Sequence, residues 1–328
     1  MSSVIRVTIH SSQFPERVQR DLAQSLRTRQ INHKFHYDSV KQAQKWLAVH
    51  EAYSPARTDP NCAAIYGSSF SGTVGRIAAP RISLISLGCG GGQKDVQLLR
   101  ILREAGKEVF YTPSDVSLAL VLTASQNATE LIPAQNCHPV VCDLTTAEDL
   151  PELLRASEPS SPGRLITFFG MIPNFEPGLI LPKLARLLEV EDHLLLSANL
   201  APGADYESGI QTILPLYDNA LTRDWLMALL LDLGIERQDG EVRFVIENCP
   251  SGADLKRVTS YFRFHRMRQV RLSGTIFHFA VGDVIRLFFS YRYTPDRVDH
   301  LLAQHQIAVL EQWIARSGEE GVFLCRKK

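Results

Sequence analysis

A glycine-rich segment is the first part of this chain whose residue types suit ligand chemistry. The run Leu87-Gly88-Cys89-Gly90-Gly91-Gly92 lies directly between a short apolar stretch and a segment with helical spacing. Glycines at such a junction let a ligand approach the backbone closely and leave the N–H groups of a helix N-terminus open to it. Gly88 and Gly90 are therefore candidate ligand contacts.

Two aspartates end the next two apolar stretches. Asp115 follows the glycines by roughly 20 to 25 residues, a spacing at which a carboxylate can accept hydrogen bonds from both hydroxyls of a ribose. Asp143 ends the following stretch, near the place expected for an adenine ring. Because the carboxyl ends of parallel strands meet at one edge of a sheet, we expect both carboxylates to serve one ligand.

The glycine pattern departs from that of dinucleotide-binding proteins. It is GxGGG rather than GxGxxG, and Gln93 stands in place of the third glycine. This favours a cofactor with one ribose and no pyrophosphate, for which S-adenosyl-L-methionine (SAM) is the natural candidate. A tight turn with two surface aspartates is the simplest alternative. An NAD-dependent dehydrogenase is disfavoured by the missing glycine and by Lys94.

The elements that position these residues alternate between apolar strands and amphipathic helices. Such alternation predicts a parallel sheet covered by helices on both faces, and right-handed crossovers make it doubly wound. The five expected strands are 81–87, 108–115, 138–144, 164–170 and 193–200.

The flanking segments have a different character. Helices are predicted over 16–29 and 40–50, and the Gly/Ser-rich run 67–75 is predicted to be a linker or mobile loop. Helical segments near 217–233 are followed by strand-like runs that predict an antiparallel sheet. These runs are 242–248, 258–272 and 274–281. The α/β core is expected to resume at about Ile285.

The sequence therefore predicts an α/β protein with a Rossmann-like doubly wound sheet and a second, smaller α+β domain. Residues 61–200 and 285–328 are assigned to the SAM-binding domain. Residues 1–60 and 201–284 are assigned to the substrate-binding domain, with the substrate cleft expected between the two.

Composition bounds the partners. Thirty-five basic and 35 acidic side chains give a net charge of zero, so no overall field favours nucleic acid or an anionic membrane. The six cysteines form no CxxC, and no histidine pair has zinc spacing, so no metal site is expected. With no apolar leader and no bilayer-length run, we expect a cytoplasmic protein acting on a small molecule, as a monomer or weakly associated dimer.

Four segments together resemble the histidine N-alpha-methyltransferase family of ergothioneine biosynthesis, which is SAM-dependent and of class I. They are YSPART (53–58), SLGCGGGQKDVQLL (86–99), FYTPSDVS (110–117) and FFGMIPNFEP (168–177). The resemblance covers most of the chain and is strongest between Tyr53 and Pro177.

The resemblance implies roles for individual positions. The positions matching cofactor contacts are Gly88, Gly90, Lys94, Asp115, Asp143 and Gly170. On the substrate side, Asn174 matches the asparagine that holds the amino-acid portion, Tyr217 the tyrosine that recognises its carboxylate, and Tyr37 and Tyr53 substrate-facing tyrosines. Asn174 and Tyr37 could orient a neutral amine toward the sulfonium, which makes them the candidate catalytic residues. The simpler alternatives are interdomain packing for Tyr37 and Tyr53, and a cap for the helix near Gly178 for Asn174.

One departure from the family concerns the substrate. The family recognises imidazole with a Glu and a Ser two residues apart, and here Phe288 stands at the Glu position while Ser290 is kept. A phenyl ring cannot accept an imidazole N–H, and a missing buried partner can discriminate between substrates by orders of magnitude. We therefore expect N-methylation of a small amino acid or amine other than histidine. If the strand register is shifted by one, the simpler alternative is that Phe288 is a core residue. The alternative is a catalytically silent relative that binds SAM or its demethylated product, S-adenosylhomocysteine, as a regulatory ligand.

Overall fold

The computed structural model describes residues 4–155, 158 and 162–328, so the remaining residues of the expected domain ranges lie outside the described part of the chain. Within it, the chain divides into two compact units. The sheet unit comprises Met1–Gln13, Pro55–Leu200 and Tyr293–Lys328. The second unit comprises Phe14–Ser54 and Ala201–Arg292.

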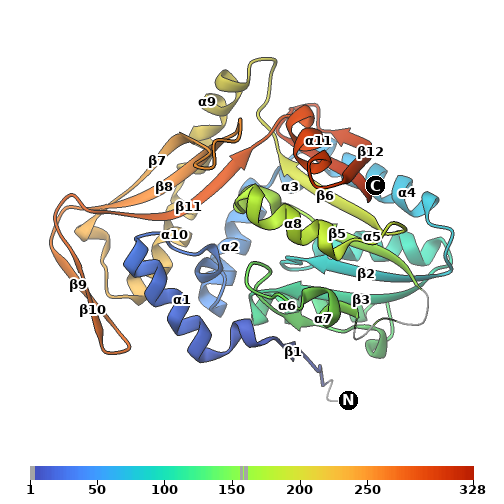
Figure 1. Cartoon of the computed structure of the whole chain (residues 1–328), viewed down its shortest axis with the longest axis horizontal. Coiled ribbons are helices and arrows are strands. Elements are labelled where there is room, and N and C mark those ends of the chain that lie inside the picture. The colour runs from blue at the N-terminus through green and yellow to red at the C-terminus, as the bar shows by residue number, and fades with distance from the viewer. Residues whose placement is uncertain (1–3, 156–157, 159–161) are drawn as a thin grey trace. The chain divides into compact units, whose positions relative to one another are not determined.

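The sheet unit is built on an eight-stranded sheet with the order β1-β4-β3-β2-β5-β6-β13-β12 (Figure 1). Pairing is parallel from β1 through β6, whereas β13 runs antiparallel to both β6 and β12. The strands are β1 (Thr8–Ile9), β2 (Arg81–Leu87), β3 (Glu108–Asp115), β4 (Val140–Val141), β5 (Gly163–Phe168), β6 (His193–Asn199), β12 (Ile307–Ile314) and β13 (Glu320–Lys327). The predicted α/β class is confirmed, and strand order reverses beside β2, where such sheets bind ligands.

The centre of the sheet consists of the strands β2, β5 and β6, which are buried along almost their whole length. In β2 every residue after Arg81 is buried, as expected for a parallel strand covered on both faces. The helices of this unit are α3 (Pro55–Thr58), α4 (Pro60–Arg76), α5 (Gln93–Glu104), α6 (Leu118–Thr129), α7 (Leu150–Arg155), α8 (Pro177–Leu187) and α11 (Pro295–Ala303). Short 3-10 turns occupy Ser11–Gln13, Ala134–Asn136 and Ile172–Asn174.

The prediction of a linker or loop over 67–75 is wrong, because this segment lies inside α4. Asp59 caps the helix by accepting a hydrogen bond from the Asn61 N–H at 2.9 Å. The glycine at position 72 lets β12 approach closely, since a Cβ there would lie 3.0 Å from the ring of Trp313. Packing against the sheet thus outweighs the low helix propensity of glycine.

The second unit combines helices with a three-stranded antiparallel sheet of order β11-β8-β7 and a separate hairpin of β9 and β10 (Figure 1). Its strands are β7 (Gly240–Asn248), β8 (Lys256–Phe264), β9 (Arg268–Leu272), β10 (Thr275–Phe279) and β11 (Val284–Arg292). Its helices are α1 (Pro15–Thr28), α2 (Val40–Tyr53), α9 (Tyr206–Tyr217) and α10 (Ala220–Asp232), with 3-10 turns at His33–His36 and Arg237–Asp239.

The boundaries of the units differ from the expected ones at two places. Strand β11 pairs with β8, so the sheet unit resumes at Tyr293 rather than at Ile285. The first described residues pair with β4 through β1 and belong to the sheet unit, as does the segment from Pro55 on, whereas residues 1–60 were assigned to the other domain. Within the described ranges, no helix is both long enough and apolar enough to cross a membrane.

Candidate functional site

The glycine-rich loop joins β2 to α5 at the carboxyl edge of the sheet. Gly88, Gly90 and Gly92 have φ of 70°, 52° and 75°, in the left-handed region that glycine adopts most readily. The N–H groups of Gly88 and Cys89 donate to the Ser114 carbonyl at 2.8 and 2.9 Å, which ties the loop to the end of β3. These backbone contacts hold the start of the loop against the end of β3.

Asp115, the last residue of β3, lies against this loop. Its Oδ2 accepts a hydrogen bond from the Gly90 N–H at 3.1 Å, and its Oδ1 accepts one from the Ser117 N–H at 3.0 Å. Burial raises the pKa of this carboxyl to about 6, against the opposing effect of these N–H groups. The structure thus brings together the two features that the sequence placed at the ends of neighbouring strands.

Asp143 lies just beyond β4, and its backbone is next to that of Asp115, because the Cys142 N–H donates to the Asp115 carbonyl at 3.0 Å. Its Oδ1 accepts from the backbone N–H and the hydroxyl of Thr145 at 2.9 and 2.5 Å. Its own N–H donates to the hydroxyl of Ser12 at 3.0 Å. Ser12 was not expected here, because its proximity depends on β1 adding to the edge of the sheet.

The turn after β5 holds Gly170 and Asn174. Gly170 has φ of 67°, and its N–H donates to the Ser197 hydroxyl on β6 at 2.8 Å. The Asn174 side-chain amide donates to the Gly170 carbonyl at 3.3 Å. Asn174 does not cap α8, whose N-cap is Glu176. The Asn174 side chain therefore points back toward the end of β5 and does not cap α8.

Lys94, in the first turn of α5, contacts two residues that sequence reasoning missed. Its Nζ donates to the Tyr66 hydroxyl at 2.6 Å and lies 3.6 Å from Oε1 of Glu320. Tyr66 belongs to α4, and Glu320 is the first residue of β13. No local pattern could have indicated this contact, since the three residues come from distant parts of the chain.

In the second unit, three of the substrate-side candidates lie together. The Tyr217 hydroxyl hydrogen-bonds the Ser290 hydroxyl at 2.9 Å, and the rings of Tyr217 and Phe288 are 6.5 Å apart. Pairing of β11 with β8 shifts between Arg286 and Phe288, so Leu287 is an extra residue in the strand. Beyond it, Phe288 and Ser290 lie two residues apart and share one face of β11.

Arg292 continues this face and was not foreseen. Its Nη2 donates to the Tyr217 hydroxyl at 2.8 Å, and its guanidinium lies 5.4 Å from the centre of the Tyr217 ring. The spacing 288, 290, 292 along a strand was the available signal, because alternate residues point to the same side.

Phe288 belongs to an aromatic cluster made of His33, Tyr37, Trp46, Trp225 and Phe288. The His33 ring stacks on Phe288 with 5.0 Å between centres, and Trp225 lies 5.5 Å from Phe288. Tyr37 packs between Trp225 and Trp46, at 5.6 and 5.7 Å. Burial, together with nearby cationic groups, holds the pKa of His33 well below its usual value, so this ring is neutral.

The remaining candidates are placed separately. Tyr53 is the last residue of α2 and is 48% exposed. Asn174 belongs to the sheet unit, whereas Tyr37, Tyr53 and the residues around Phe288 belong to the second unit.

Two other features have little capacity for chemistry. Burial and the nearby Asp115 carboxylate raise the pKa of the Cys89 thiol, which is unsuited to act as a nucleophile. Among the described residues, no group of three His, Cys, Asp or Glu side chains could hold a metal ion.

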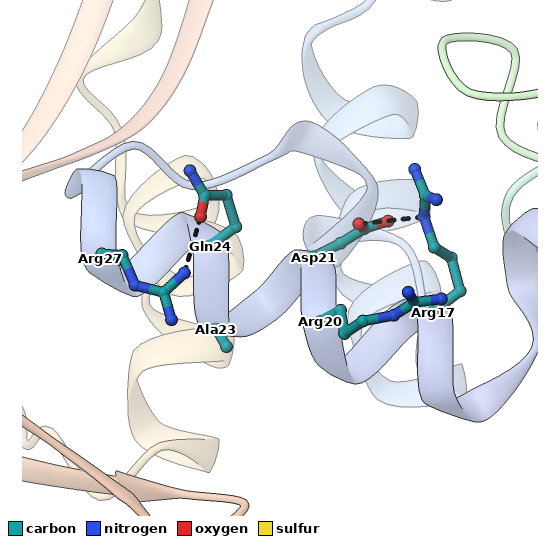
Figure 2. A pocket seen from close by; sticks show the side chains of 6 residues that line it. All are labelled: Arg17, Arg20, Asp21, Ala23, Gln24 and Arg27. Atoms are coloured by element: carbon teal, nitrogen blue, oxygen red, sulfur yellow. Dashed lines mark hydrogen bonds and ion pairs between the residues drawn. The ribbon is translucent and has the colours of Figure 1, made fainter.

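A shallow hollow of about 360 Å³ lies on the surface of α1 (Figure 2). Its lining residues are Arg17, Arg20, Asp21, Ala23, Gln24 and Arg27. Asp21 already pairs with Arg17 at 3.3 Å, and Arg27 donates to Gln24 at 2.7 Å. Because all its residues come from one helix, the hollow is a solvated face rather than an enclosed site.

Comparison with known proteins identifies a family to which this chain is similar. A model of the family described as "Histidine-specific methyltransferase, SAM-dependent" matches residues 14–327. The N-methyltransferase imqF of Aspergillus flavus is 24% identical over 247 residues, which cover 73% of this chain and 66% of that protein. The match thus spans slightly less than two thirds of the relative's length.

Solved structures also show similarity at low sequence identity. The 1,6-didemethyltoxoflavin-N1-methyltransferase of Burkholderia thailandensis is 11% identical, with a TM-score of 0.44 and 87% of each chain covered. The amino pentose methyltransferase CalS10 of Micromonospora echinaspora is 14% identical, with a TM-score of 0.40 and coverage of 85% of this chain and 97% of that one.

Proposed function

We propose that this chain, which belongs to the family of SAM-dependent, histidine-specific methyltransferases, transfers a methyl group from SAM to an amino nitrogen. Because Phe288 stands where the family has its imidazole-binding Glu, the proposed acceptor is a small amino acid or amine other than histidine. SAM, the cofactor of this family, supplies a methyl group made electrophilic by the adjacent sulfonium. The chain's own residues have to bind it, place the acceptor and keep the acceptor nitrogen neutral.

The cofactor half of this proposal is supported by the edge formed by the loop after β2 and the end of β3. Asp115 accepts an N–H on each carboxylate oxygen, so lone pairs remain for the two hydroxyls of a ribose. The left-handed glycines put backbone rather than side chains beside the ligand. Lys94, close to the same loop, carries an ammonium that suits the carboxylate of the methionyl portion.

The acceptor has to present a neutral amine with its lone pair toward the methyl group. Asn174 and Tyr37 are the proposed contacts, because a carboxamide and a phenol can hydrogen-bond an amine without adding charge. Positioning of this kind can supply roughly 7 to 11 kcal/mol of the barrier reduction, and it requires no covalent intermediate.

One observation carries the proposed specificity: Phe288 and Ser290 both approach Tyr217 from the same face of β11. This supports the alignment in which a phenyl ring stands where the family has an imidazole-binding Glu. The ring also packs with Trp225 and the neutral His33, so its surroundings favour an apolar or aromatic side chain. Tyr217, backed by the Arg292 guanidinium, is the proposed contact for a carboxylate.

The test combines binding with a competition assay. Calorimetry with S-adenosylhomocysteine first establishes cofactor binding. The enzyme with SAM is then offered histidine, tryptophan, tyrosine and small amines together, and the products are read by mass. We expect methylation of an aromatic or apolar acceptor in preference to histidine. Efficient trimethylation of histidine would refute the specificity, whereas cofactor binding with no methylated product from any acceptor would favour a silent relative.

A further inference from the structure

A buried carboxylate stands beside Lys94 in the sheet unit. Glu320 is 5% exposed, and its Oε1 accepts a hydrogen bond from the Tyr66 hydroxyl. Its Oε2 accepts a weaker one from the Cys62 thiol at 3.5 Å. Burying a carboxylate costs free energy unless it is paired and hydrogen-bonded, so the buried position of Glu320 calls for a structural or functional explanation.

Lys94 joins this network through only part of its hydrogen-bonding capacity. Its Nζ donates to the Tyr66 hydroxyl at 2.6 Å, while its 3.6 Å separation from Glu320 is an ion pair rather than a hydrogen bond. Within the part of the chain that the structure describes, only one of the three ammonium N–H groups therefore has a hydrogen-bond acceptor. The other two remain available to an anionic ligand.

Tyr66 links the Glu320 carboxylate to Lys94 by hydrogen bonds. Burial and the Glu320 carboxylate hold the pKa of this phenol far above its usual value, so it keeps its proton and donates it to Glu320. Toward Lys94 the phenol oxygen is therefore an acceptor and not a donor. The ammonium also lies over two aromatic faces, 4.0 Å from the centre of the Tyr66 ring and 5.6 Å from that of Phe169, which restricts its position further.

The network lies at the edge where the cofactor is proposed to bind. Lys94 is the second residue of α5, the helix that follows the glycine-rich loop, and Glu320 pairs with Asn199 at the carboxyl end of β6. Ser197 of the same strand hydrogen-bonds Tyr66 and also accepts the Gly170 N–H at 2.8 Å. The network and the turn after β5 therefore share one side chain.

We propose that Glu320 and Tyr66 are positioning residues that hold the Lys94 ammonium in place for the carboxylate of the methionyl portion of SAM. The proposal rests on the proposed function, since it takes SAM as the ligand. Both oxygens of Glu320 already accept hydrogen bonds, so this residue restrains Lys94 rather than binding the ligand. The ligands recognised in this way are nucleosides that carry an α-amino acid carboxylate.

The test compares two ligands that share adenine and ribose. S-adenosylhomocysteine carries the amino-acid portion, and 5′-methylthioadenosine lacks it. In calorimetry, Glu320→Gln and Tyr66→Phe are each expected to raise the Kd for S-adenosylhomocysteine roughly tenfold, as loss of a charge-assisted contact does, while leaving the Kd for 5′-methylthioadenosine within about twofold. In a Lys94→Met background, neither substitution should weaken S-adenosylhomocysteine further. Tyr66→Phe keeps the proposal testable should Glu320→Gln fail to fold.

Tyr111→Phe is the matched control, because Tyr111 is another buried phenol of the sheet unit that donates to a carboxylate, Asp95, at 2.6 Å. It should lower thermal stability without changing the ratio of the two Kd values. Equal weakening of both ligands, no weakening of either, or an effect that persists without Lys94 would overturn the positioning role alone. Failure of the unaltered protein to bind either ligand would contradict the proposed function together with this proposal.

Discussion

Asp115 and Gly90 are joined directly: the Gly90 N–H donates to Oδ2 of Asp115 at 3.1 Å and links the loop after β2 to the end of β3. The two residues come from different strand ends, since Gly90 follows β2 and Asp115 is the last residue of β3. A ligand that needs a close backbone approach and a carboxylate would find both at this point of the sheet.

Removal of the Asp115 carboxylate should abolish most of the affinity for the cofactor. In Asp115→Ala, the ribose hydroxyls lose their acceptor while staying out of water, which costs about 1.5 to 3 kcal/mol. Calorimetry with S-adenosylhomocysteine measures this, and Asp115→Asn, which keeps the shape of the side chain, is the companion variant. Unchanged affinity in both variants would refute the assignment of Asp115 to the ribose.

Cofactor affinity should depend on pH through the same residue. Without a ligand, the pKa of the Asp115 carboxyl is about 6, so this group becomes protonated and neutral in more acidic solution. The ribose hydroxyls hydrogen-bond best to the ionised carboxylate, so the ligand can bind there only after the carboxyl loses its proton. The Kd for S-adenosylhomocysteine should therefore rise as the pH falls below about 6, by up to roughly tenfold per unit. The Asp115→Asn variant should lack this dependence between pH 5 and pH 7. A flat profile in the unaltered protein would contradict the prediction.

Exchange of Phe288 for the family's acid should shift the substrate preference. Phe288→Glu restores an acceptor for an imidazole N–H two residues from Ser290, and Tyr217 remains to hold the substrate. The ratio of kcat/KM for histidine to that for an aromatic amino acid should increase at least tenfold. Phe288→Leu controls for the loss of the ring and should leave histidine a poor substrate. An unchanged ratio in Phe288→Glu would show that residues other than Phe288 determine the preference against histidine.

The second unit should lose stability in mild acid because of buried histidines. His36 hydrogen-bonds the Leu287 carbonyl through Nε2 at 2.8 Å, and burial lowers its pKa to about 4. The unfolded state then binds more protons than the folded state between about pH 6.5 and pH 4, so the free energy of unfolding falls as the pH falls. From pH 7 to pH 5 this one residue contributes a loss of about 2 kcal/mol.

Urea unfolding followed by tryptophan fluorescence measures that loss. His36→Gln should reduce the difference between pH 7 and pH 5, because the side chain no longer titrates. His278→Gln is the control, since His278 is exposed on β10 of the same unit. An equal pH effect in all three proteins would show that other groups are responsible.

The glycine at position 92 should be required for stability on steric grounds. Its φ is 75°, and a Cβ there would lie 2.8 Å from the Cα of Ala124 in α6. Gly92→Ala combines backbone strain with this clash and should cost about 2 to 4 kcal/mol in the free energy of unfolding. Gly106 has φ of 73°, and no atom lies within 4 Å of the place that a Cβ would occupy there, so Gly106→Ala isolates the strain and should cost only about 1 kcal/mol. Equal costs would mean that the approach of α6 is not what selects glycine.

Much of the sheet edge that is proposed to bind the cofactor could be predicted from the sequence, because its elements depend on local patterns. The apolar runs that become β2 and β3 are continuous, and the glycines and Asp115 follow them directly. Parallel strands then bring these ends to one edge whatever the details of packing. The positions of Phe288 and Ser290 on one face followed from strand alternation in the same way.

Features that depend on contacts between residues far apart in the sequence could be seen only in the tertiary structure. The run 67–75 has the composition of a loop, yet it is helical because the sheet buries one side of α4 and Trp313 needs the space at Gly72. The addition of β1 to β4 and the pairing of β11 with β8 set the boundaries of the two units. Lys94 and Glu320 lie 226 positions apart in the chain, and the antiparallel placement of β13 beside β6 brings the carboxylate to within 3.6 Å of the lysine.

The sequence alone determined which local segments could form strands and a glycine-rich turn, since those follow from residue type and spacing. Which of the remaining side chains meet was decided by long-range pairing and packing, because those contacts have no periodic signature along the chain.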